Sequence, residues 1–188
     1  MKVYCACAIA ALLADFTGFD AEKAARHVGD CQAYDGGLAL EPEREAHGGA
    51  TYCGCAAHEL LRKHAGAPAT LDVGAVVGWC SRRQEGGFSG RVGKPPDACY
   101  AFWVGASLRM LGAAESVDSD EAAAFVMSCE SVHTGGFSKF PDGSAADLLH
   151  SFYSVCALSW ASPGVLRPVD PLLGICESRL PHRLKGPP

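Results

Sequence analysis

An aspartate and a cysteine two residues apart, Asp97 and Cys99, stand at the start of an apolar run. A carboxylate and a thiolate in this position can both bind a zinc ion, and a third ligand from another segment leaves the fourth position open for a substrate. His150 is the natural third ligand, because it opens the next apolar run at the comparable place. Asp147, one turn earlier, is placed to orient that histidine. Spacing alone favours a simpler interpretation, an N-cap aspartate followed by a core cysteine.

Two basic residues, Arg91 and Lys94, stand three apart just before this pair, and Tyr100 follows it. Guanidinium and ammonium groups at this spacing suit an anionic ligand. His47 lies in the equivalent loop nearer the N-terminus. A solvated loop with ordinary charges is an equally good interpretation. Aromatic residues cluster near the same loops. Such residues usually belong to a core, but beside a cationic rim they would also suit a lipid diphosphate. The residues are Tyr52, Tyr100, Phe102, Trp103, Phe152 and Tyr153.

The chain repeats one pattern, in which a helix-like segment ends at a cysteine and a pair of glycines follows within a few residues. Glycine permits the positive φ that ends a helix. A polar loop and an apolar, helix-like run come next each time. Helices that alternate with such a period stack as a solenoid or close into an α/α barrel. The cysteines are 49 residues apart, and the motifs are Cys31 with Gly36 and Gly37, Cys80 with Gly86 and Gly87, and Cys129 with Gly135 and Gly136.

The predicted fold is therefore all-α, an α/α barrel (toroid) of helical-hairpin repeats of about 50 residues, with weak strand signals. We expect repeats around residues 1–50, 51–99 and 100–161 in a domain of residues 1–170, followed by an irregular Pro-rich tail at 171–188. A closed barrel needs more repeats than these, so we expect an incomplete one. The predicted helical runs are Ala6–Leu13, Thr51–Leu61, Ala98–Leu111 and Leu148–Ala161.

Composition narrows the function classes. The chain has 188 residues, of which 48% are hydrophobic and 20% charged, as is typical of a globular domain. A formal net charge of -5 argues against nucleic-acid binding, and no apolar stretch is long enough to span a membrane. Ten cysteines fit a secreted disulfide scaffold or free thiols, and their places in apolar runs favour thiols in the reducing cytoplasm. The apolar run after Lys2 imitates a signal peptide, but we favour a core helix.

Three stretches carry motifs whose order and spacing are specific. The stretches are Glu45–Gly49 with Thr51–Gly54, then Gly87–Arg91 with Lys94, Asp97, Cys99, Tyr100, Phe102 and Trp103, and finally Gly135–Phe137 with Asp147 and His150. Together they resemble the β subunits of protein prenyltransferases. The resemblance covers nearly the whole chain, from Tyr4 to about Asp170.

This resemblance implies an α/α barrel that pairs with a helical α subunit and attaches an isoprenoid to a cysteine near the C-terminus of CaaX-type proteins. Bound to zinc, the substrate thiol would be held as the thiolate that attacks the allylic diphosphate. The resemblance assigns zinc to Asp97, Cys99 and His150. It assigns the diphosphate, whose developing charge needs stabilisation, to His47, Arg91, Lys94 and Tyr100. It places the isoprenoid pocket at Gly49, Cys53 and Trp103.

Lys139 bears on the subtype. Farnesyl and Rab-type members of the family carry an aspartate two residues before the proline of the Gly-Gly-Phe segment, where this chain has Lys139. Type I geranylgeranyl members resemble this chain there and do not require magnesium, because an ammonium group can stand in for the magnesium ion beside the diphosphate. Residues 34–39 and 102–106 also look like type I, whereas Tyr153 departs from its usual phenylalanine. The resemblance favours type I over a farnesyltransferase β subunit.

Other interpretations remain. The family has an arginine three residues before the tyrosine matched by Tyr4, and this chain has Met1 there. The N-terminal half of the family domain is also missing, so we expect the isolated chain to aggregate or to need its upstream half or an α subunit. A truncated, non-catalytic helical-repeat remnant is therefore an alternative. Terpene cyclases share the barrel, but the aspartate motif that they use for protonation is not seen.

Overall fold

The computed structural model describes residues 2–161, 164–181 and 184. In these ranges the chain forms seven α-helices, two 3₁₀ turns (Ala114–Ser116 and Glu177–Arg179) and one pair of two-residue strands, β1 (Gln84–Glu85) and β2 (Gly87–Phe88). The predicted all-α class is confirmed. The helices are α1 (Lys2–Leu13), α2 (Ala21–Asp30), α3 (Gly48–Ala65), α4 (Val73–Ser81), α5 (Tyr100–Met110), α6 (Ser119–Ser128) and α7 (Leu148–Ala161).

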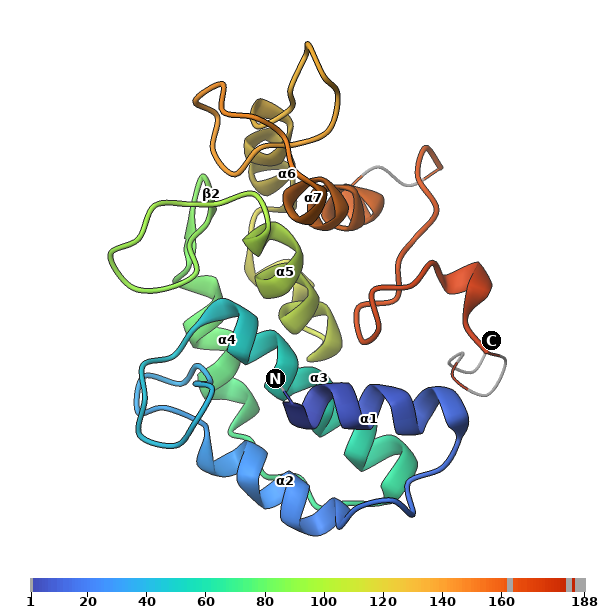
Figure 1. Ribbon diagram of the computed structural model, residues 1–188. Helices are drawn as coiled ribbons and strands as arrows, with labels where there is room; N and C mark the ends of the chain where they lie inside the picture. Colours follow the sequence, from blue (N-terminus) through green and yellow to red (C-terminus); the bar gives the residue numbers. More distant parts are fainter. Residues whose placement is uncertain (1, 162–163, 182–183, 185–188) are drawn as a thin grey trace.

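The helices alternate between two layers of an arc (Figure 1). Helices α1, α3, α5 and α7 follow one another side by side and form the inner layer. Helices α2, α4 and α6 form the outer layer and pack against α3, α5 and α7, respectively. Residues 164–181 run back toward α1. Each inner helix therefore presents its first turn near the same end of its neighbours, where the loops of successive repeats meet.

The three outer helices begin at an aspartate. Asp20, Asp72 and Asp118 are the N-caps of α2, α4 and α6, and each carboxylate accepts backbone N–H bonds from the first turn. An N-cap aspartate satisfies donors that a helix start leaves unpaired and so fixes where the helix begins. This recurring cap is a repeat signal that the sequence analysis missed.

The loops after α2 and α6 close in the same way. A backbone bridge joins Gln32 to Leu38 in one loop and Glu130 to Phe137 in the other. Residues 168–177 form a further loop of this type, since Val169 bridges to Cys176 and Gly174 has a φ of 65°. The sequence analysis instead predicts an irregular tail from residue 171 onward, because the prolines of this segment mask the repeated pattern. The domain boundary at residue 170 stays a prediction, and residues 182–183 and 185–188 of the tail lie outside the described residues.

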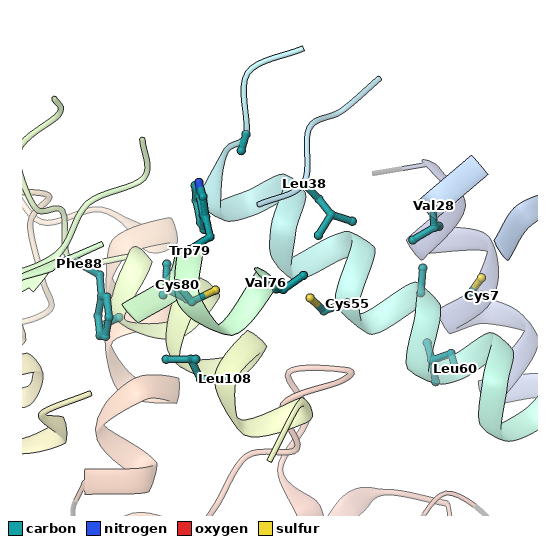
Figure 2. Packing of buried hydrophobic residues seen from close by; sticks show 14 of the residues in the cluster. Cys7, Val28, Leu38, Cys55, Leu60, Val76, Trp79, Cys80, Phe88 and Leu108 are labelled. Atoms are coloured by element: carbon teal, nitrogen blue, oxygen red, sulfur yellow. The ribbon is translucent and has the colours of Figure 1, made fainter. Parts of the chain in front are cut away.

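A hydrophobic core lies between the layers and combines small side chains with a few large aromatic ones (Figure 2). The cysteines at helix contacts, including Cys7, Cys55 and Cys80, are fully buried and act as small apolar groups. All ten cysteines are free thiols, as the sequence analysis favours. The largest fully buried side chains are Trp79, Phe88 and Phe102. Within the described ranges, no helix is both long and apolar enough to cross a membrane.

Three predicted helical runs are present with shifted ends. The run predicted at 51–61 extends over Gly48–Ala65, the run at 98–111 is Tyr100–Met110, and the N-terminal run begins at Lys2. The second shift has a chemical consequence. Asp97 and Cys99 lie in the turn before α5, where the Asp97 Oδ1 accepts the Cys99 N–H at 3.0 Å. The side chain that defines the turn is thus also a candidate ligand.

Candidate metal centre and anion pocket

The side chains of Asp97, Cys99 and His150 converge between the start of α5 and the first turn of α7. One ligand atom from each lies within 4.8 Å of the other two. The convergence follows from the fold, because α5 and α7 are neighbours in the inner layer and both present their first turns here. All three residues are more than half covered, and Asp97 and Cys99 are buried. The structure therefore brings together residues that lie 53 positions apart in the sequence.

Asp97 is held from three sides. Its backbone N–H donates to the Phe88 carbonyl at 3.0 Å, and its Oδ1 accepts the Cys99 N–H. The same Oδ1 lies 3.4 Å from the Nε2 of His150. These contacts fix the carboxylate in one orientation, which is the arrangement expected of a ligand that is preorganised for a cation.

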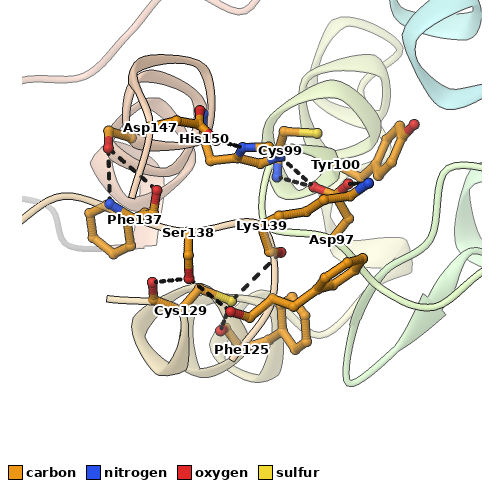
Figure 3. A network of polar contacts seen from close by, with 12 residues as sticks. Asp97, Cys99, Tyr100, Phe125, Cys129, Phe137, Ser138, Lys139, Asp147 and His150 are labelled. Atoms are coloured by element: carbon orange, nitrogen blue, oxygen red, sulfur yellow. Dashed lines mark hydrogen bonds and ion pairs between the residues drawn. The ribbon is translucent and has the colours of Figure 1, made fainter. Parts of the chain in front are cut away.

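Asp147 orients His150 (Figure 3). Its Oδ1 accepts the His150 backbone N–H at 2.9 Å, and its Oδ2 lies 2.6 Å from the ring Nδ1. These two hydrogen bonds hold the pKa of Asp147 below its usual range, so that the carboxylate is ionised at neutral pH. With Nδ1–H donated to this carboxylate, the lone pair of Nε2 is directed toward Asp97 and Cys99.

The arrangement fits a zinc ion. Ligand atoms about 2.1 Å from a tetrahedral zinc lie roughly 3.4 Å apart, and His150 Nε2 is 3.4 Å from Asp97 Oδ1. A small closing movement of the Cys99 sulfur would complete a three-residue site with one open position. Burial and the adjacent Asp97 carboxylate raise the pKa of the Cys99 thiol. A bound cation would reverse that effect, since a coordinating thiol is deprotonated.

A polar pocket opens beside this cluster. Its basic side chains, Arg91, Lys94 and Lys139, come from two successive repeats. Arg91 lies 3.4 Å from Glu45, and Lys139 lies 3.6 Å from Asp97. The family resemblance predicts that His47, Arg91, Lys94 and Lys139 converge at one diphosphate site; the last three line this pocket, and His47 contacts it only through Tyr100. The full lining is Gly90, Arg91, Lys94, Pro95, Asp97, Tyr100, Lys139 and Phe140.

His47 borders the pocket through Tyr100. Its Nδ1 accepts the Gly49 N–H at 3.0 Å, so in the neutral ring Nε2 carries the proton and donates to the Tyr100 hydroxyl at 2.9 Å. Burial, with Arg91 nearby, lowers the pKa of His47, which keeps the ring neutral. Burial, with Cys99 and Asp97 nearby, raises the pKa of Tyr100 to about 12. The Tyr100 hydroxyl therefore keeps its own proton free to donate to an anion.

Gly90 shapes the pocket wall in a way that the motif alone does not explain. A Cβ at Gly90 would lie 2.1–2.5 Å from the Tyr100 ring and hydroxyl. The Gly90 carbonyl also accepts the Gly48 N–H at 2.8 Å, which ties the two loops together. Only glycine therefore allows the two loops to hold Tyr100 at the pocket wall.

An aromatic cluster lies beyond Tyr100, along the inner helices. Trp103 packs edge-on against Tyr100 and against Tyr153, with ring centroids 5.3 and 5.0 Å apart, respectively. Gly49 gives the Trp103 ring room, because a Cβ there would lie 3.1 Å from it. Cys53 packs in the same cluster. The three residues predicted for an isoprenoid pocket thus lie near one another.

The sequence analysis missed one contact of this cluster. The hydroxyls of Tyr4 and Tyr52 both donate to the Leu172 carbonyl, at 2.8 and 3.2 Å. The bond from Tyr4 spans almost the whole described chain, so no local pattern signals it. It anchors the loop of residues 168–177 against α1 and α3.

Comparisons with known proteins agree with this geometry. The family description "Prenyltransferase alpha-alpha toroid domain" matches residues 2–175. The chain is 43% identical over 182 residues to the geranylgeranyl transferase type-1 subunit beta of Arabidopsis thaliana, covering 92% of this chain and 48% of that protein. It is 35% identical over 180 residues to the protein of the same name from Dictyostelium discoideum, covering 93% of this chain and 49% of that one.

A solved structure described as Candida albicans protein geranylgeranyltransferase-I complexed with GGPP superposes with a TM-score of 0.84 at 25% identity, covering 94% of this chain and 53% of that chain. The chain thus spans about half the length of the curated relatives that it matches. It belongs to the prenyltransferase family, with the fold of the α/α toroid.

Proposed function

We propose that this chain is the catalytic part of a protein geranylgeranyltransferase type I β subunit that works in the cytoplasm with zinc and an α subunit. The single observation that carries the proposal is the convergence of Asp97, Cys99 and His150 beside a pocket that Arg91, Lys94 and Lys139 line. A metal centre next to a cationic pocket suits a reaction between a thiol and a diphosphate ester.

The reaction joins the sulfur of a protein cysteine to C1 of geranylgeranyl diphosphate, breaks the C1–O bond and releases diphosphate. A zinc ion held by Asp97, Cys99 and His150 would keep the substrate thiol as thiolate, whose proton passes to solvent. Asp147 keeps the His150 ring in the tautomer that presents Nε2. Because the chain supplies three ligands, a fourth position remains for the substrate.

The pocket residues act on the leaving group. As C1–O breaks, negative charge gathers on the diphosphate oxygens, and donors already placed there stabilise it. Arg91 and Lys94 supply positive charge, and Tyr100 donates its hydroxyl proton as a hydrogen bond, since His47 supplies the proton that the Tyr100 oxygen accepts. Trp103, Gly49 and Cys53 offer an apolar surface beside the pocket for the isoprenoid chain.

Lys139 supports the type I assignment. Its ammonium faces the pocket and carries a positive charge where a carboxylate would instead call for a magnesium ion. We therefore propose that magnesium is not required. The names of the relatives from Arabidopsis thaliana and Dictyostelium discoideum support the same subtype. A farnesyltransferase β subunit is the second candidate, favoured by Tyr153, which contacts Phe102 and Trp103 inside the cluster.

The test is a prenyl-transfer assay on the full protein co-purified with an α subunit. CaaX peptides ending in leucine or serine separate the two subtypes. Transfer from geranylgeranyl diphosphate to the leucine peptide, undiminished when magnesium is removed, is the expected result. Strict magnesium dependence with preference for farnesyl diphosphate would assign the farnesyl subtype. Zinc-free protein without transfer would instead favour a non-catalytic remnant.

A further inference from the structure

Lys139 is fixed to the candidate metal centre by its backbone. Its carbonyl accepts the Ala98 N–H at 3.1 Å, directly between the two ligands Asp97 and Cys99. Its side chain lies beside the same turn, with Nζ 3.6 Å from the Asp97 Oδ2 and about half of the side chain exposed. Figure 3 shows the ammonium next to the carboxylate. The lysine therefore touches the metal centre as well as the anion pocket.

The two oxygens of Asp97 have different neighbours. Oδ1 faces His150 and the Cys99 N–H, on the side of the metal centre. Oδ2 faces Lys139, on the side of the pocket. A cation so close to a ligand carboxylate opposes the binding of a second cation by the same carboxylate. Lys139 and a zinc ion thus compete for Asp97.

A diphosphate in the pocket would change this competition. It carries several negative charges, and the half-exposed Lys139 side chain is free to turn toward it, whereas Asp97 is buried and held by its backbone. Arg91 and Lys94 line the same pocket but form no ion pair with Asp97 among the described residues. Of the basic residues of the pocket, Lys139 is therefore the one placed to link the two sites.

We propose that Lys139 is a positioning residue that couples the two sites: it pairs with Asp97 when the pocket is empty and with the diphosphate when the pocket is filled, so that diphosphate binding strengthens zinc binding. The inference rests on the proposed function, because it needs both ligands. Coupling between two sites is reciprocal, so zinc must strengthen diphosphate binding by the same factor. We expect a factor of about five, at the lower end of typical coupling energies.

The experiment measures the zinc affinity of the full protein with and without inorganic diphosphate. Because diphosphate itself chelates zinc, a metal buffer holds free Zn²⁺ at known values. In the wild-type protein, diphosphate should tighten zinc binding about fivefold. Lys139→Met should bind zinc more tightly than wild type without diphosphate, and diphosphate should add little. Lys139→Arg should keep the coupling, which shows that the charge and not the fold is responsible.

Lys94→Met is the matched control. Lys94 lines the same pocket, so this variant should bind diphosphate more weakly, but its zinc affinity without diphosphate should equal that of wild type. Zinc affinity and diphosphate response that are unchanged in Lys139→Met would overturn the inference and leave the proposed function standing. A wild-type protein that binds no zinc at Asp97, Cys99 and His150 would overturn both.

Discussion

The metal cluster and the cationic pocket lie side by side but are built differently. In the cluster, the side chains of Asp97 and His150 are 8% and 13% exposed, and backbone and carboxylate hydrogen bonds hold them. In the pocket, the side chains of Arg91 and Lys139 are 44% and 50% exposed. Their ion pairs, with Glu45 and Asp97, are 3.4 and 3.6 Å long, respectively. The side chains of Asp97 and His150 are already oriented by these contacts, whereas the half-exposed side chains of Arg91 and Lys139 have more freedom to rearrange.

The proposed function accounts for this difference. A metal site gains affinity when its ligands are already oriented, because little conformational entropy remains to be lost. In the proposed reaction, the pocket must stabilise charge that moves from an ester to a free diphosphate, and long flexible cations can do so. Substitutions in the cluster should therefore have larger effects than those in the pocket.

The largest effect is expected from Cys99→Ala. Loss of one of three protein ligands should weaken zinc binding by more than about 100-fold and abolish prenyl transfer. The measurement is zinc content after dialysis against a weak chelator, with Cys129→Ala as the matched control. Cys129 is buried in the next repeat and is not among the three ligands. Equal zinc content in the Cys99 variant and wild type would show that the cluster is not the metal site.

Asp147→Asn should have the next largest effect. Asparagine can still accept the His150 backbone N–H, so α7 should keep its start. The ring Nδ1 loses its anionic partner, however, and zinc affinity should fall about tenfold. A competition titration with a chelator gives this number. If the variant bound zinc as tightly as wild type, Asp147 would be no more than a helix cap.

Variants of Arg91 and of its ion-pair partner Glu45 should act in opposite directions. Arg91→Ala removes a cation and should weaken diphosphate binding about tenfold. Glu45→Gln frees Arg91 from its exposed partner and should strengthen binding by about twofold, since exposed ion pairs contribute little. Isothermal titration with inorganic diphosphate measures both, and zinc content should stay at the wild-type value. A loss of zinc in either variant would contradict the separation between the two regions.

Glu59, in the second half of α3 and away from both regions, should affect the stability of the fold and neither ligand site. His58, Arg62 and Lys63 surround its carboxylate and lower its pKa to about 2. Because the folded-state pKa lies below the ordinary 4.5, its stabilising contribution is present above pH 4.5 and is lost as the pH falls toward 2. Glu59→Gln should cost about 1–2 kcal/mol of unfolding free energy at pH 7.

Thermal or urea melts at pH 7 and near pH 3 test this prediction. The difference between Glu59→Gln and wild type should shrink at the lower pH. Zinc content should not change, since the substitution lies outside both regions. A difference that is constant with pH would mean that the carboxylate charge contributes nothing to stability.

Much of the candidate site could be predicted from the sequence because its residues match the motifs of a known family, whereas the spacing alone favours a helix cap and a core cysteine. His47, Asp97 and His150 stand at corresponding places before or within the first turns of inner helices, so one period relates them. The family resemblance also placed Arg91, Lys94 and Lys139 beside one diphosphate. The ion pair of Lys139 with Asp97 could not be predicted, because it depends on how the loops of two repeats meet in space.

The structure of the C-terminal segment could not be predicted from the sequence. Its prolines predict irregular structure, yet residues 168–177 repeat the earlier loops and anchor the Tyr4 and Tyr52 hydroxyls. The anchor is a backbone carbonyl, so the identity of Leu172 carries no signal for it. A pattern of side-chain types along the sequence cannot reveal contacts that backbone groups make at long sequence separation.

Anomalous diffraction at the zinc edge tests the central claim most directly. Crystals of the zinc-loaded full protein should show one strong peak about 2.0–2.3 Å from Asp97, from the Cys99 sulfur and from the His150 Nε2. The peak should vanish in crystals of Cys99→Ala that were loaded in the same way. A peak elsewhere, or a density at these residues without anomalous signal, would contradict the assignment of this cluster as the zinc centre of a protein prenyltransferase.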